Sequence, residues 1–155
     1  MPHLLYVSCV ALHILAAALW VGGMGFFALV IVPGLRRLDD ELRRAILRDV
    51  GARFAIVGWY NLGVLVLTGI GNLTFRGLLS STLTMVFWTT PFGHTLALKL
   101  LLVALVFALT YAHYKDALRP GPETPADRRR ASWLGRWTMI VSIVIAILGV
   151  RLVRG

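Results

Sequence analysis

Cysteine is almost absent from this 155-residue sequence, and acidic residues are scarce. Cys9 is the single cysteine, so neither a disulfide within the chain nor a Cys-x-x-Cys motif can be formed. Charged residues make up only 15% of the chain, with 7 Asp and Glu against 16 Lys and Arg. Soluble proteins carry roughly 25% charged residues. The composition therefore excludes an ordinary water-soluble domain.

The start of the sequence lacks the basic stretch of a secretory signal peptide. Residues 1–4 contain no Lys or Arg. The apolar run that follows is also far longer than the roughly 7–15 residues of a signal-peptide core. We therefore expect the first apolar segment to be retained as a transmembrane helix.

Apolar residues, by contrast, are abundant at 58% of the chain, and they gather in long segments. A helix needs about 20 such residues to cross about 30 Å of hydrocarbon. The sequence predicts an all-α integral membrane four-helix bundle, a single domain over residues 1–155. Its spans are expected at about residues 4–32, 54–75, 91–114 and 133–153. The first is expected to stop at Pro33-Gly34, a pair that ends helices.

Basic residues gather in two connections between these spans. Twelve of the 16 Lys and Arg residues lie within residues 34–53 and 115–136. The positive-inside rule then makes loops 33–53 and 115–132 cytoplasmic, with both termini outside, in the inner (plasma) membrane. Such charge in a soluble protein would suggest nucleic acid. Here membrane topology accounts for it, so the lipid bilayer is the expected partner and nucleic acid is not.

The connections have distinct local patterns. Residues 35–50 place acidic side chains before basic ones, which complements the helix dipole and predicts a short cytoplasmic helix. Residues 119–130 predict a flexible, proline-rich connector. Residues 76–90 are apolar for a loop and predict an interfacial helix or a lid on the outer side.

Ionisable residues within the spans are the first functional candidates, because each costs roughly 2.5–3.5 kcal/mol to insert. His13, Lys99 and His113 lie inside spans, and His94 lies at the outer end of the third. Counting about 1.5 Å per residue, His13 and Lys99 are both about 12–13 Å deep. The sequence therefore predicts that they face each other across the interior.

Two nitrogen ligands at one depth are typical of a haem site in a helical bundle. His13, Trp20 and Met24 follow one helix stripe, among small residues that let a flat ligand approach. We therefore predict a haem b cofactor with His13 as axial ligand and Lys99 or His94 opposite. Trp20 and His113 are expected to line the site. Electron transfer, or a porphyrin- or quinone-linked oxidation, would be its work.

Alternatives remain open for the same residues. His13 suits an interhelical hydrogen bond, Lys99 can snorkel to headgroups, and Asn61 and Asn72 are typical of helix–helix hydrogen bonds. The chain would then be a structural or assembly subunit of a respiratory complex. Copper is the alternative metal, because Cu(I) prefers soft ligands and Cys9 shares a helix face with His13, with Met24 further along.

Several motifs resemble a known family, over nearly the whole chain. They are His13, LWVGGMGFFALVIVPGLRR, Leu67-Thr68-Gly69 and HTLALKLLLVALVFALTYAHY. Together they resemble the copper-resistance protein D (CopD) family, and the skeleton is similar to HemJ-type protoporphyrinogen oxidases, which bind haem b. The second resemblance implies an essential histidine and lysine that match His13 and Lys99, and makes Lys99 a catalytic candidate in a haem-dependent oxidoreductase. The segment Trp20-Val21-Gly22-Gly23 favours the CopD side. A homodimer and a respiratory-chain or quinone partner are also expected.

Overall fold

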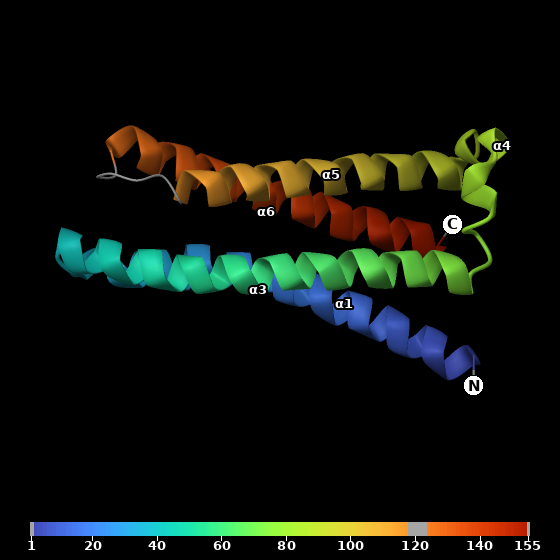
Figure 1. Ribbon diagram of the computed structural model, residues 1–155, viewed down its shortest axis with the longest axis horizontal. Coiled ribbons are helices and arrows are strands. Elements are labelled where there is room, and N and C mark those ends of the chain that lie inside the picture. The colour runs from blue at the N-terminus through green and yellow to red at the C-terminus, as the bar shows by residue number, and fades with distance from the viewer. Residues whose placement is uncertain (1, 118–123, 155) are drawn as a thin grey trace. The chain divides into compact units, whose positions relative to one another are not determined.

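The computed structural model describes residues 2–117 and 124–154, and these form helices and short connections without a strand. Four helical stretches are long and apolar enough to cross a membrane, which confirms the predicted all-α fold with four spans. They are His3–Arg37, Asp40–Phe75, Pro91–Asp116 and Pro125–Leu152. The chain divides into two compact units, Met1–Ser81 and Thr82–Gly155, and each contains a pair of antiparallel long helices (Figure 1).

The α-helical part of the first span ends at Gly34, as predicted, and one 3₁₀ turn continues the helical path to Arg37. Helix α1 (Pro2–Phe26) continues through a π-helical turn (η1, Phe27–Ile31), α2 (Val32–Gly34) and a 3₁₀ turn (η2, Leu35–Arg37). In the π turn the Val32 amide donates to the Phe27 carbonyl, five residues back. The wider turn shifts the register of the backbone hydrogen bonds just before Pro33. Proline has no amide proton and therefore cannot donate a hydrogen bond in this register. The helix can therefore pass the proline.

The predicted short helix at residues 35–50 and the second span are one continuous helix. Helix α3 runs from Asp40 to Phe75, 36 residues. Its first turns carry intrahelical ion pairs, with Asp40 bonded to Arg43 at 2.6 Å and Arg53 bonded to Asp49 at 3.2 Å. Acidic residues first and basic residues later are the order that the sequence predicted. The prediction of a helix in residues 35–50 was therefore wrong only in its bounds.

Two short helical turns occupy the connection to the third span. Helix α3 ends at Phe75 and is followed by Gly77, whose φ of 68° allows the Leu78 amide to reach the Leu73 carbonyl at 2.9 Å. A 3₁₀ turn (η3, Ser81–Leu83) and helix α4 (Met85–Trp88) follow. The predicted helix in residues 76–90 is thus present as four residues. Its position at a membrane interface stays a prediction.

Helix α5 (Pro91–Ala117) begins at a Thr-Pro pair. The Thr90 hydroxyl accepts from the Gly93 amide at 3.0 Å and donates to the Phe87 carbonyl at 2.7 Å. This cap brings the backbone of α4 directly against Gly93. A Cβ at position 93 would overlap the Phe87 carbonyl, so the close approach of α4 and α5 requires glycine.

Helix α6 (Pro125–Arg154) also begins at a Thr-Pro pair, inside the segment predicted to be a flexible connector. Thr124 and Asp127 cap each other: the Asp127 carboxylate accepts from the Thr124 amide at 3.0 Å, and the Thr124 hydroxyl accepts from the Asp127 amide at 3.2 Å. The connector prediction was therefore wrong for residues 125–130, and residues 119–123 lie outside the described part. Asp116 at the end of α5 then bonds Arg130 of α6 at 2.8 Å.

Candidate metal-binding site

The candidate site lies in the seam between α1 and α3. Small residues on one helix receive large side chains from the other along this seam. Trp20 packs on Gly58, where an added Cβ would lie 3.1 Å from the indole. Phe54 packs on Gly23 in the same way, at 3.0 Å, and its ring lies 5.7 Å from that of Phe27. Small residues let membrane helices approach closely, and this approach sets the position of the polar groups between them.

His13 is held by Thr68 across the seam. The Nδ1 atom of His13 lies 2.7 Å from the Thr68 hydroxyl oxygen. That hydroxyl has one proton, and the Val64 carbonyl, 2.6 Å away, can only accept it. Nδ1 of His13 must therefore donate to Thr68. In a neutral imidazole the lone pair then lies on Nε2, which is the atom able to bind a metal.

Cys9 meets the same residue one turn away along α1. Its thiol donates to the Thr68 backbone carbonyl at 3.4 Å. The sulfur also fills the space above Gly71, where an added Cβ would lie only 2.8 Å away, while a Cβ at Gly69 would be 3.7 Å from the His13 ring. Thr68 thus contacts both candidate metal ligands: its carbonyl contacts Cys9 and its hydroxyl contacts His13.

Asn61 and Trp20 contribute to the packing of α1 against α3. Asn61 donates to the Ala16 carbonyl at 2.9 Å and is buried, which confirms the predicted helix–helix hydrogen bond. The indole of Trp20 is only 7% exposed and rests on Gly58. Its predicted contact with a cofactor stays a prediction. The Asn72 side-chain oxygen is buried, and nothing within the described residues bonds to it.

The other predicted site residues lie in the second unit. Lys99 of α5 is half-buried, and its amine lies 3.5 Å from the Cβ position of Gly149 on α6. His94 is exposed in the first turn of α5, and His113 is exposed near its last turn. The facing of His13 and Lys99 across the interior therefore stays a prediction, as do the roles of His94 and His113.

Within residues 2–117 and 124–154, no group of three or more His, Cys, Asp or Glu side chains comes close enough to hold a metal. The seam contains two possible metal ligands, the His13 imidazole and the Cys9 thiol, and both contact Thr68. Imidazole and thiol suit copper, whereas carboxylate-poor surroundings do not suit magnesium or calcium. The hydrogen bond to Nδ1 is the kind of outer contact that orients a metal-binding histidine.

Thr68 is the site residue that the sequence reasoning missed. It was noticed only as part of a family motif, and a threonine in a span is usually bonded to its own helix. The signal was available in the spacing: Thr68, Gly69 and Gly71 form a small-residue stretch near the C-terminal end of the second span. Antiparallel pairing brings that end beside Cys9 and His13.

These observations define an all-α, multi-pass membrane protein. In its first helix pair, a cysteine and a histidine both form hydrogen bonds with the same threonine. The family model for copper resistance protein D matches residues 48–153, and the chain belongs to that family as a multi-pass protein of the inner membrane. The matched range includes Thr68 and Lys99. The predicted CopD family is thereby confirmed.

A relative from Aquifex aeolicus (strain VF5), named only as an uncharacterized protein, is 31% identical over 147 residues. The aligned stretch covers 91% of this chain and 90% of that protein. No solved structure matches the chain.

Proposed function

We propose that this protein binds copper within the membrane, with Cys9 and His13 as its first ligands. The observation that carries the proposal is that Thr68 contacts both residues, through two different atoms. Membership of the copper resistance protein D family supports copper as the metal. The handling of copper across or within the inner membrane is the function that follows.

The chemistry of the two donors suits a metal that must move. A thiolate and an imidazole are both suitable ligands for Cu(I), and the family of the chain favours copper over other metals that these ligands accept. A site of only two protein ligands leaves positions at the metal that an incoming or outgoing ligand can occupy. Met24 lies further along the same stripe of α1 as His13, and it supplies a thioether of the kind that would receive the ion next.

A competition titration tests the proposal. Reduced, detergent-purified protein is titrated with Cu(I) against a coloured Cu(I) chelator. The wild-type chain is expected to bind one Cu(I). Cys9→Ser and His13→Gln are each expected to lower the affinity at least about tenfold, because each removes one of two ligands. His3→Gln, an exposed histidine at the start of the same helix, is the matched control. Unchanged affinity in both site variants would overturn the proposal.

Haem b is the second candidate, and the tautomer of His13 favours it too. An axial histidine binds iron through one ring nitrogen and donates from the other, as His13 would with Thr68. In this proposal Lys99 or His94 would be the second residue that holds the haem, and the chain would act as an oxidoreductase.

Cys9 separates the two candidates. Cys9→Ser abolishes tight Cu(I) binding if copper is the ligand, but leaves a haem spectrum untouched, because the haem proposal gives the thiol no role. A Soret band with stoichiometric iron in the purified protein, lost in His13→Ala and kept in Cys9→Ser, would establish haem in place of copper. Co-purification with a larger complex and no bound metal would support the structural alternative.

A further inference from the structure

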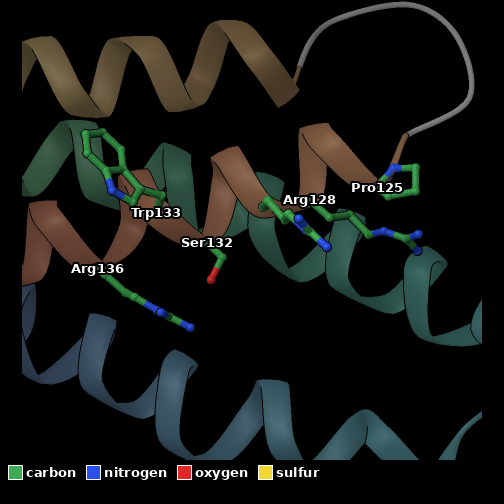
Figure 2. A pocket seen from close by; sticks show the side chains of 6 residues that line it. Pro125, Arg128, Ser132, Trp133 and Arg136 are labelled. Atoms are coloured by element: carbon green, nitrogen blue, oxygen red, sulfur yellow. The ribbon is translucent and has the colours of Figure 1, made fainter.

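One face of α6 carries a basic pocket near the start of the helix. Pro125, Arg128, Arg129, Ser132, Trp133 and Arg136 line a shallow hollow of about 490 Å³ (Figure 2). Each of these residues is three or four positions from at least one other member of the group, so they lie on one broad face of the helix. Arg128 is half-buried and the others are exposed.

The arginines of this pocket differ in their ion pairing from Arg130 of the same helix and from several arginines of α3. Among the described residues, no carboxylate forms an ion pair with Arg128, Arg129 or Arg136. Arg130, on a different face of the same turn, is paired with Asp116 at 2.8 Å. Arg43, Arg44 and Arg53 of α3 are likewise paired with carboxylates of their own helix. The pocket therefore gathers three arginines that form no ion pair within the described residues.

The predicted start of the fourth span puts the pocket at the depth of lipid headgroups. The predicted fourth span begins at Trp133, whose ring packs edge-on against Trp137 at 5.7 Å, and paired aromatics are typical of a membrane–water interface. Arg128 precedes Trp133 by five residues, about 7.5 Å along the helix axis. The headgroup layer on each side of the hydrocarbon is about 5–8 Å thick. Arg136 lies one turn inside and can reach outward on its flexible stem.

We infer that this pocket binds the phosphate of an anionic phospholipid headgroup. Guanidinium groups bind phosphate oxygens in pairs, and the Ser132 hydroxyl offers a further donor on the same face. The Trp133 ring would lie beside the upper acyl chain. The site is independent of the metal site in the other helix pair.

Lipid binding to the detergent-purified full chain, measured by native mass spectrometry with added phosphatidylglycerol or phosphatidylcholine, tests the inference. Phosphatidylglycerol is expected to bind one per chain and much more tightly than phosphatidylcholine. Each arginine near a membrane surface contributes about fivefold in affinity. Arg128→Gln and Arg136→Gln should each weaken binding by about that factor, and the triple Arg128→Gln/Arg129→Gln/Arg136→Gln variant by roughly a hundredfold. The single variants keep the test valid if the triple variant folds poorly.

The matched control removes the same charge elsewhere. Arg43→Gln/Arg44→Gln/Arg53→Gln deletes three arginines that already have carboxylate partners, and it should leave phosphatidylglycerol binding within about twofold. Equal losses in the two triple variants, or equal binding of the two lipids, would overturn the inference. Displacement of the lipid by millimolar inorganic phosphate would also overturn it, because the site would then take a free anion.

Discussion

At the scale of single residues, Thr68 organises the candidate site. Its hydroxyl gives its only proton to the Val64 carbonyl and therefore accepts from His13. Its own backbone carbonyl also accepts a hydrogen bond from the Cys9 thiol, because the two helices approach closely at Gly71. The chemistry proposed for the metal depends on this one residue as much as on the two ligands.

Thr68→Val tests that dependence. Valine keeps the shape but leaves the His13 Nδ1 proton without its acceptor, and the loss of such an outer contact costs about 10–100-fold in metal affinity. We expect Cu(I) binding to fall in that range, while Thr68→Ser, which keeps the hydroxyl, stays near wild type. Chelator competition measures both. Equal affinity of the valine and serine variants would contradict the role given to Thr68.

Gly71→Ala tests the position of the cysteine. The added methyl group would lie 2.8 Å from the Cys9 sulfur, so the thiol must rotate away. Gly69→Ala makes the same chemical change two residues earlier, where the nearest site atom is at 3.7 Å. We expect Cu(I) affinity to fall about tenfold or more in Gly71→Ala only. A similar loss in both variants would mean that general helix packing is responsible.

At the scale of helices, the ends follow signals that the sequence already contained. Both α5 and α6 begin at Thr-Pro, with the threonine capping and the proline at the first helical position. Helix α3 ends at Phe75, and Gly77 just beyond it has the left-handed conformation. The π turn before Pro33 was not predicted, because no local residue pattern indicates it. Its first residue, Phe27, packs against Phe54 of α3.

The junction of α4 and α5 gives a prediction about stability. Gly93→Ala places a methyl group against backbone atoms of Phe87 and Trp88, which cannot rotate away. Overpacking of this kind costs about 1–3 kcal/mol, so the midpoint of thermal unfolding should fall by several degrees. Gly135→Ala of α6 has open space around its Cβ and should keep or raise the midpoint. Unfolding of the two variants in detergent, followed by circular dichroism, makes the comparison; equal midpoints would contradict the close approach.

At the scale of the whole molecule, the distribution of arginines predicts the sidedness of the chain. In a Cys9→Ser background, Ser80→Cys should react with a membrane-impermeant maleimide in intact cells, because residues 76–90 are expected outside. Asp39→Cys should react only after the membrane is opened, since it lies in the connection with most basic charge. Both positions are exposed. The reverse pattern would overturn the predicted topology.

Much of the fold could be predicted because membrane insertion depends on composition over about 20 residues, which a sequence states directly. The candidate site could be predicted only in part. His13 was found because an ionisable residue in a span is costly, whereas Thr68 is uncharged and its importance arises from pairing with a helix about 55 residues away in sequence. The facing of His13 and Lys99 is a relation between the two units and stays a prediction.

The central claim is that Cys9 and His13 bind copper together, and copper K-edge X-ray absorption of the chain loaded with one equivalent of Cu(I) tests it most directly. The account predicts a first shell containing sulfur and imidazole nitrogen, with the sulfur lost in Cys9→Ser and the imidazole lost in His13→Gln. A first shell without sulfur, or a sulfur contribution unchanged in Cys9→Ser, would contradict it.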